Sequence, residues 1–570
     1  MTLQKALDKI DSITKESLNN EQKKIAKEII TKTSINNEAD DNVLKFILSN
    51  IKLGFVFDSA PEVVQDNVAI INEYKNLNIN IQRERESSKQ ESINNKVEHT
   101  LIIGENYEAL RNLKLAYIQN INGKTQGLID VIYIDPPYNT EKTKEDGNDY
   151  KQEVKSEKFI YRDKFKRTGW LNMMNERLLL AKDLLIETGV IFISIDDNEQ
   201  AYLKVLCDEI FGEENFVNDF CWINNLKGRQ ISKCGAVKTY EHILCYSKNS
   251  FNLDTFQVQL DYVKEIMPSI YKMSDYEIMN DSKGSFVIKN ELYNTNSAFN
   301  EKTRKSLVFD IYYNPVTKQI KTEDVSSKTI EGFIKICPHK NSNGTHKYHA
   351  WRWSREKIKN DYEDLYFLVE GTNCRIYTKI RDLNTTSFKD SIMISGNGAS
   401  EFKKIMSKSI FAFPKPSLLI KLLLKTISNR NSIILDFFAG SGTTAQAVME
   451  LNQEDDGKRK FILVTNNENN IAEDITWERI YRVINGEGSK NEKIEWKYSN
   501  NIKSLENNSL RVFDIKHYKC SINTDPQKLI DIAKKEISKL NSTFNLKDEV
   551  SICNDLSSLH PYEKYQSEEK

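Results

Sequence analysis

The four residues Asp135-Pro136-Pro137-Tyr138 bring a carboxylate, free carbonyls and an aromatic ring together directly after the apolar run VIYI. Two prolines fix φ and remove two N–H donors, so carbonyl oxygens at the end of this run remain to accept hydrogen bonds from a ligand. The set suits a flat ring with an exocyclic amine, such as adenine. The amine would donate to Asp135 and to the Pro136 carbonyl, while Tyr138 would stack on the ring. We therefore interpret the segment as a catalytic turn rather than a β-turn with a buried aromatic.

A glycine-rich segment, Asp436 to Thr444 (DFFAGSGTT), lies about 300 residues further along the chain, between the run SIIL and the helical pattern TAQAVMEL. Gly440 and Gly442 allow a tight turn and a close approach of the backbone to a ligand. The helix that follows directs N–H groups at that ligand. The segment lacks the GK[ST] ending of a phosphate-binding loop. With an acid at Asp436, it favours a ligand that has an adenosine end and an amino-acid end.

Both segments fall within a pattern of short apolar runs that alternate with amphipathic helical stretches. HTLIIGEN, GLIDVIYI, GVIFISID, HILCYSKN, SIIL and KFILVTNN read as strands, and WLNMMNERLLLAKDLL and FPKPSLLIKLLLKTI read as helices. This alternation is typical of a mostly parallel sheet with helices on both faces. The fold class expected is therefore α/β and doubly wound. One half of this domain would occupy residues 99–250 and the other half residues 406–500.

Residues 251–405 interrupt the alternating pattern and read as an inserted α+β domain. They contain the aromatic and basic segment KYHAWRWSREKIK. Such residues suit contacts with nucleic-acid phosphates and bases, and a basic surface over buried tryptophans is the alternative. The candidates for DNA contact are Lys347, Tyr348, Trp351, Arg352, Trp353, Arg355 and Lys357, with Lys335, Lys340, Arg375 and Arg381 as further cations. Cys337, His339, His346 and His349 match no standard zinc spacing, so no metal site is expected.

The two ends of the chain are expected to differ from the α/β domain. Residues 1 to about 75 show apolar residues at helical spacing, so residues 1–98 read as a helical extension followed by a polar linker. Residues 501–570 read as a polar tail with one amphipathic helix in PQKLIDIAKKEISKL.

Composition restricts the classes of protein that the chain can represent. It has 570 residues, 39% of them hydrophobic and 29% charged, and a net charge of −1. No apolar run is long enough to cross a membrane and the first residues resemble no signal peptide, so a cytoplasmic protein is expected. The eight cysteines are scattered, as in a reduced protein. Because the net charge is near zero, any contact with DNA must come from local basic patches.

With DPPY and the FAGSGTT turn in this order, the chain resembles the β class of DNA amino-methyltransferases, which have the class I, Rossmann-like fold. The segments LIIGENYEAL, GWLNMMNERLLLAKDLLIETGVIFISIDD, FPKPSLLIKLLL and KFILVTNNENNIAEDITWERI also match in order. The resemblance covers about residues 100–250 and 405–485. Within this class, the chain is similar to the modification (Mod) subunits of type III restriction–modification systems, in size, in the helical extension, in the insert and in the segment ILDFFAGSGTTAQAVMELN.

The resemblance implies S-adenosylmethionine as the methyl donor, double-stranded DNA as the substrate and adenine N6 as the accepting atom. It also implies a homodimer, a restriction (Res) subunit as partner, and a target-recognition role for the insert. Carried over by position, Asp135, Pro136, Pro137 and Tyr138 are the catalytic residues. The donor-binding residues would be Asn106, Phe413, Pro414, Lys415, Asp436, Phe438, Gly440, Ser441, Gly442 and Thr443. The acid expected at the ribose is replaced by VTNNEN, which leaves Asn467 and Glu468 as alternatives.

Two other functions remain open at this point. Cytosine N4 is the alternative acceptor on the same fold, although DPPY, rather than a serine-headed version, favours adenine. A DNA-recognition scaffold for a Res subunit, with methylation secondary or lost, belongs to a different class. The intact DPPY and FAGSGTT segments count against that loss.

Overall fold

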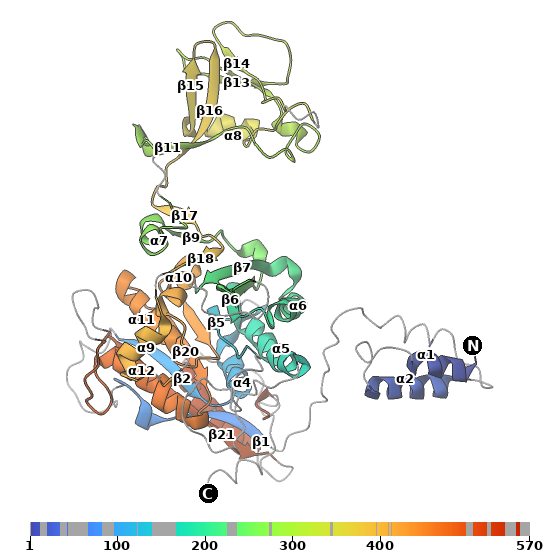
Figure 1. Ribbon diagram of the computed structural model, residues 1–570, viewed down its shortest axis with the longest axis vertical. Coiled ribbons are helices and arrows are strands. Elements are labelled where there is room, and N and C mark those ends of the chain that lie inside the picture. The colour runs from blue at the N-terminus through green and yellow to red at the C-terminus, as the bar shows by residue number, and fades with distance from the viewer. Residues whose placement is uncertain are drawn as a thin grey trace.

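The protein is described by a computed structural model, in which the placed residues are 2–11, 20–34, 43, 67–81, 96–121, 124–138, 167–224, 236–272, 276–341, 346–394, 396–408, 410–411, 413–496, 505–520, 526–541 and 555–558. Its centre is one ten-stranded sheet (Figure 1). In spatial order the strands are β1 (Asn67–Glu73), β21 (Asn508–Lys519), β2 (Val97–Ile103), β20 (Lys460–Thr465), β19 (Ile433–Asp436), β5 (Ile129–Ile134), β6 (Leu185–Ile195), β8 (Tyr240–Ser247), β7 (Phe216–Ile223) and β18 (Ser391–Ile392). The six strands from β21 to β6 run parallel, and β1 and β8 pair antiparallel to their neighbours.

Helices cover both faces of the sheet, as the alternating pattern predicts. Along β5, Val131 and Tyr133 belong to one hydrophobic core, whereas Ile132 and Ile134 belong to the other. The first core contains residues of α7 (Leu260–Ile266), α9 (Gly398–Met406), α10 (Ser417–Ile427), α11 (Thr443–Asp455), the π-helix Ile471–Trp477 and α12 (Glu478–Asn485). The second contains residues of α4 (Asn106–Tyr117), α5 (Arg167–Leu184), α6 (Gln200–Phe211) and α13 (Pro526–Leu540). A doubly wound, mostly parallel α/β fold is therefore confirmed.

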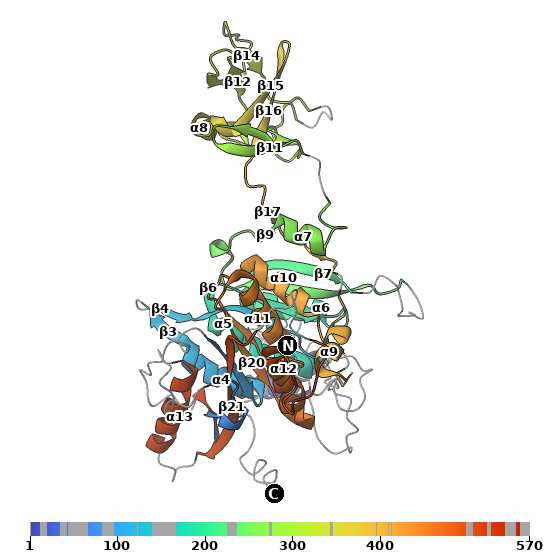
Figure 2. The ribbon, with the colours of Figure 1, turned by 90° about the vertical axis from the view of Figure 1, so that its left-hand side faces the viewer.

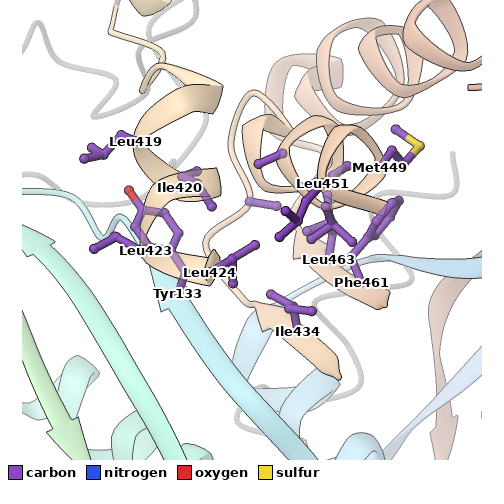
Figure 3. Packing of buried hydrophobic residues seen from close by; sticks show 14 of the residues in the cluster. Tyr133, Leu419, Ile420, Leu423, Leu424, Ile434, Met449, Leu451, Phe461 and Leu463 are labelled. Atoms are coloured by element: carbon purple, nitrogen blue, oxygen red, sulfur yellow. The ribbon is translucent and has the colours of Figure 1, made fainter. Parts of the chain in front are cut away.

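The helix α10 packs against α11 and also against β5, so it connects the second half of the domain to the first over the middle of the sheet. Figure 3 shows Leu423 of α10 near Tyr133 of β5 and Leu424 of α10 near Ile434 of β19, in the same hydrophobic core as Leu451 of α11. These leucines are buried, and each buried side chain of this kind contributes about 1.5–3 kcal/mol. This packing fixes the ends of β5 and β19, where the two candidate turns begin.

Strands at one edge of the sheet correct the interpretation of both chain ends. Helix was expected throughout residues 1–75, and α1 (Leu3–Asp11) and α2 (Asn20–Thr33) do pack on each other, but residues 67–73 form the strand β1. The tail contributes the expected helix α13 together with an unexpected strand, β21, which lies between β1 and β2. A short apolar run such as VAII has no period that separates helix from strand. Its pairing with β21, more than 400 residues away, decides the outcome.

The insert is narrower than the predicted range 251–405. Among the placed residues of this range, the separate core contains residues between Leu292 and Ile376, whereas Phe256, Val263 and Phe402 belong to the core of the α/β domain. This module contains β10 (Met279–Asp281), β11 (Gly284–Glu291), β12 (Asp310–Tyr313), β13 (Ile320–Glu323), β14 (Ile334–Ile336), α8 (Arg355–Asn360), β15 (Leu365–Glu370) and β16 (Asn373–Ile380). It is joined to the main domain through the paired strands β9 (Gln257–Gln259) and β17 (Thr385–Ser387), as Figures 1 and 2 show.

Two smaller findings complete the fold. The strands β3 (Ile118–Ile121) and β4 (Lys124–Gly127) form a hairpin that the sequence pattern did not indicate. Among the helices that the structure describes, none combines the length and the apolar character needed to cross a membrane.

Candidate active site

The two turns singled out in the sequence meet at one edge of the sheet. The strands β5 and β19 are parallel neighbours, with Val131 opposite Ile434. The carboxyl ends of parallel strands lie at the same edge, so Asp135, after β5, and the turn that begins at Asp436, at the end of β19, lie next to each other. The fold thus joins two segments that are about 300 residues apart in the chain.

The DPPY turn, which the sequence predicts to be catalytic, is held by hydrogen bonds that leave one carbonyl available. The indole N–H of Trp170 on α5 donates to the Pro137 carbonyl at 2.7 Å. No donor from the described part of the chain reaches the carbonyl of Pro136. The Tyr138 hydroxyl donates to Asp135 Oδ1 at 2.9 Å. The arrangement predicted from two prolines, with a carboxylate beside an available carbonyl, is therefore present for Pro136 and absent for Pro137.

An ammonium and a second carboxylate complete this turn. Lys415 Nζ lies 2.9 and 3.0 Å from the two oxygens of Asp135 and donates to the Tyr138 hydroxyl at 2.7 Å. Glu241 Oε2 of β8 lies 3.1 Å from the same hydroxyl, as a second possible acceptor for its one hydrogen, and 3.4 Å from Nζ. Burial raises the pKa of Asp135, while Lys415 opposes that rise. Burial alone would lower the pKa of Lys415, but Asp135 and Glu241 outweigh it and keep the ammonium charged. Sequence reasoning did not identify Glu241, which is two strands away from β5 in the sheet.

The glycine-rich turn wraps around the carboxyl group of Asp436. Phe438 N–H donates to Asp436 Oδ1 at 3.0 Å and the Thr444 hydroxyl donates to Oδ2 at 2.5 Å. Burial nevertheless raises the pKa of Asp436 to about 7. Gly442 has φ +73°, and a Cβ there would lie 3.3 Å from Thr476 Cγ2. Because L-residues rarely adopt this conformation, the turn requires glycine at this position.

Arg479 of α12 supports the same turn through hydrogen bonds. Its buried guanidinium donates to the Ser441 carbonyl at 3.2 Å and to the Thr443 hydroxyl at 2.7 Å, and also to Ser441 Oγ and Gln446 Oε1. These acceptors are neutral oxygens, so the arginine acts as a rigid multiple donor rather than as half of an ion pair. Its contribution was not predicted, because the segment WERI has no recognised turn chemistry.

Residues of the glycine-rich turn line one cavity together with Asp135, the one residue of the DPPY turn on its wall. Eight of the predicted donor-binding residues lie on its wall, namely Phe413, Pro414, Lys415, Asp436, Phe438, Gly440, Ser441 and Thr443. Asp135 is on the same wall, together with Tyr133, Phe411, Ile420, Ala439 and Thr444, which were not predicted. Phe413 lines the cavity but is 72% exposed, which is unusual for a phenylalanine.

The remaining predicted donor-binding residues lie outside that wall. Asn106 is buried behind the turn, where it donates to the Phe437 carbonyl at 3.0 Å and accepts from Arg177. It therefore supports the turn from behind. Asn467 follows β20, and its amide nitrogen donates to Glu473 at 3.1 Å. Among the described residues its Oδ1 is buried and lacks a hydrogen-bond partner. Glu468, the alternative, begins the short 3₁₀ turn Glu468–Asn470.

The insert residues proposed to contact DNA divide into buried and exposed groups. Trp351 is only 4% exposed, and its indole donates to the Phe309 carbonyl at 2.7 Å, so its prediction as a DNA contact is wrong. Its aromatic area stabilises the core of the insert instead. Lys347 and Arg352 are exposed and Tyr348 and Trp353 are half-buried. Arg355 forms an ion pair with Asp324 and Lys357 with Asp361, so this segment is less basic than its sequence indicates.

Three histidines of the insert lie close together. The ring of His349 is 4.8 Å from that of His346 and 6.0 Å from that of His339. Within the described ranges, no group of three or more His, Cys, Asp or Glu side chains has the arrangement of a metal site.

Comparison with known proteins identifies the family. The family model described as DNA methylase matches residues 129–475, and a model for an uncharacterised conserved protein matches residues 3–121. The EcoPI Mod subunit, a type III restriction-modification enzyme of Escherichia phage P1, is 31% identical over 68% of this chain and 60% of its own length. The type II methyltransferase M.KpnI of Klebsiella pneumoniae is 30% identical over 62% of this chain and 79% of its own length.

The site and the fold define a doubly wound α/β protein with one cavity between two strand-end turns. The chain belongs to the DNA methylase family. It spans about 60% of the length of the type III Mod subunits that it matches. A solved structure of M1.HpyAVI with SAM aligns with 67% of this chain and 98% of its own, at 14% identity and a TM-score of 0.29.

Proposed function

We propose that this protein transfers a methyl group from S-adenosylmethionine to the N6 amine of adenine in DNA. The observation that carries the proposal is a cavity whose wall contains Asp135 of the DPPY turn and five residues of the glycine-rich turn predicted to bind the donor, Asp436, Phe438, Gly440, Ser441 and Thr443. One turn is built to accept hydrogen bonds from an amine, and the other is built to approach a ligand closely. Holding two reactants side by side supplies much of a catalyst's acceleration.

The cavity has the groups that S-adenosylmethionine requires. Asp436 offers a buried carboxyl group to the cationic end of the donor, and Gly440, on the cavity wall, leaves room for it beside the backbone. Asn467 is favoured over Glu468 at the ribose. Among the described residues, the buried Oδ1 of Asn467 has no hydrogen-bond partner, and a ribose hydroxyl would supply the missing donor. When bound, the donor supplies an electrophilic methyl group on sulfonium.

The catalytic turn activates the amine. The lone pair of the adenine amine is delocalised into the ring, which makes it a poor nucleophile. Hydrogen bonds from its two hydrogens to Asp135 and to the Pro136 carbonyl favour a pyramidal nitrogen with a localised lone pair. With the donor bound, the new N–C bond would form as the S–C bond breaks, and the nitrogen would then release one proton to solvent. The target base must leave the duplex to reach this position, where Tyr138 offers a stacking surface.

The insert is the natural target-recognition domain, and Lys347 and Arg352 are its exposed candidates for phosphate contacts. Several relatives are Mod subunits of type III restriction-modification enzymes. On that basis we assign the chain the role of a modification and specificity subunit that forms a homodimer and works with a Res subunit. ATP use and DNA cleavage would then belong to the partner.

The test uses the purified full chain, labelled S-adenosylmethionine and unmethylated genomic DNA, followed by digestion to nucleosides. The expected product is N6-methyladenine. Label only in N4-methylcytosine would replace adenine by cytosine as the acceptor on the same site. No label, from folded protein that binds the donor, would favour the alternative in which the chain is a DNA-recognition scaffold for a Res subunit.

A further inference from the structure

The ammonium of Lys415 occupies the position that the catalytic turn is built to offer to an amine. It donates to both oxygens of Asp135, at 2.9 and 3.0 Å, and lies 4.9 Å from the centre of the Tyr138 ring. The proposed function assigns these same two side chains to the target base. A donor nitrogen therefore lies against the Asp135 carboxylate, and a cation lies at the hydroxyl end of the Tyr138 ring.

The ammonium and the base compete for these groups. Lys415 is 9% exposed, and its Nζ is also 5.8 Å from the centre of the Trp222 ring, so the ammonium is largely removed from solvent. A buried ammonium that leaves Asp135 needs another carboxylate, because an unpaired charge in such a site is costly. The second carboxylate must lie within reach of the lysine without itself belonging to the catalytic turn.

Glu241 meets that requirement. Its Oε2 is 3.4 Å from Lys415 Nζ, which is an ion-pair distance but longer than a charge-assisted hydrogen bond of about 2.8 Å. A shift of the ammonium by less than about 1 Å would complete that bond. The Glu241 carboxylate is also held in place, because the Asn224 amide donates to its other oxygen at 2.7 Å. The ammonium has three hydrogens, and four acceptors are near it, namely the two oxygens of Asp135, the Tyr138 hydroxyl and Glu241 Oε2. Glu241 is the most distant of the four and is therefore the acceptor without a short hydrogen bond from Lys415.

We propose that Lys415 occupies the amine position of the catalytic turn in the resting protein, and that Glu241 is the positioning residue that takes over its ammonium when the target base binds. The inference rests on the proposed function, since it presupposes an amine that binds Asp135. It gives Glu241 an indirect part in methyl transfer. In the absence of Glu241 the ammonium stays on Asp135 and opposes entry of the base.

The test is a double-mutant cycle of Glu241→Gln and Lys415→Met, measured as single-turnover methylation of unmethylated genomic DNA fragments at saturating DNA. Glu241→Gln should slow transfer by about tenfold in the presence of Lys415, and by much less in the Lys415→Met background, because there is no ammonium left to displace. DNA affinity, measured by fluorescence anisotropy, should change little. An equal loss from Glu241→Gln in both backgrounds would overturn the proposal.

A pH profile separates this role from a purely structural one. Lys415 lowers and Glu241 raises the pKa of Asp135. The acid limb of the rate profile should therefore move to higher pH in Lys415→Met and to lower pH in Glu241→Gln, and unmoved limbs in both variants would count against the proposal.

The matched control is Lys421, which forms ion pairs with Glu450 at 3.2 Å and Glu454 at 2.6 Å away from the cavity wall. Glu450→Gln and Lys421→Met should leave the acid limb in place. Failure of the wild-type protein to form N6-methyladenine would remove the proposed function and this inference with it. An active wild type with an additive cycle would remove the inference alone.

Discussion

The buried carboxyl group of Asp436 makes the stability of the protein depend on pH in a way that one substitution removes. Asp436 is 3% exposed, and burial raises its pKa from 3.8 to about 7. Because the pKa is higher in the folded than in the unfolded chain, the unfolded chain loses this proton first. The folded state therefore loses stability as the pH rises from about 4 to about 7. A difference of about three pH units, at about 1.4 kcal/mol each, amounts to about 4 kcal/mol.

Asp436→Asn replaces the carboxyl group by an amide of the same shape that does not ionise. The amide oxygen can still accept from Phe438 N–H, so the turn retains that bond. We expect the free energy of unfolding of the variant, relative to wild type, to rise by up to about 4 kcal/mol between about pH 4 and about pH 8. Urea unfolding without the donor, followed by far-UV circular dichroism at several pH values, measures this difference.

The control for this experiment is Asp261→Asn, because the Asp261 side chain is 98% exposed. Its stability relative to wild type should stay constant over the same range of pH. If the Asp436→Asn difference were equally constant, the carboxyl group would be ionised throughout, and the assignment of a raised pKa would be refuted.

Three further predictions follow from single contacts. Arg479→Met leaves the buried acceptors of the glycine-rich turn unsatisfied, at a cost of about 1–3 kcal/mol each. The Kd for S-adenosylmethionine, measured by calorimetry, should therefore rise at least about tenfold, and Arg479→Lys should not restore it. An unchanged Kd would contradict this role of Arg479. Trp351→Ala should destabilise the insert by about 3–5 kcal/mol, seen as faster proteolysis there with donor binding intact; unchanged proteolysis would mean that the indole is not part of the core. Lys347→Ala should reduce the salt slope of DNA binding by about one, whereas an unaltered slope would exclude Lys347 from the phosphate contacts.

Strand periodicity and the two turns were enough to predict the parallel sheet. Both turns follow local rules, since prolines end one strand and glycines permit the other turn, so Asp135 and Gly442 were identified without knowledge of contacts. The strand β1 was missed because its apolar run is short and its partner β21 is distant in the chain. Periodicity cannot register a pairing over such a separation.

The residues that support the site were less accessible to sequence reasoning. Glu241 reads as an ordinary polar residue at the start of a strand, and only the strand order β5-β6-β8 brings it to Tyr138. Arg479 reads as a solvated charge on an amphipathic helix, yet it is fully buried beneath the glycine-rich turn. Trp351 shows the opposite error, since an aromatic among basic residues proved to belong to the core of the insert. In each case tertiary packing decides the role.

The central claim is that Asp135 activates an adenine amine beside a separately bound donor. Asp135→Ala tests it most directly, with S-adenosylmethionine binding by calorimetry, DNA binding by anisotropy and N6-methyladenine by nucleoside analysis on one preparation. We predict that the variant binds donor and DNA about as well as wild type and forms no N6-methyladenine. Wild-type levels of N6-methyladenine from this variant would contradict the assignment of the active site.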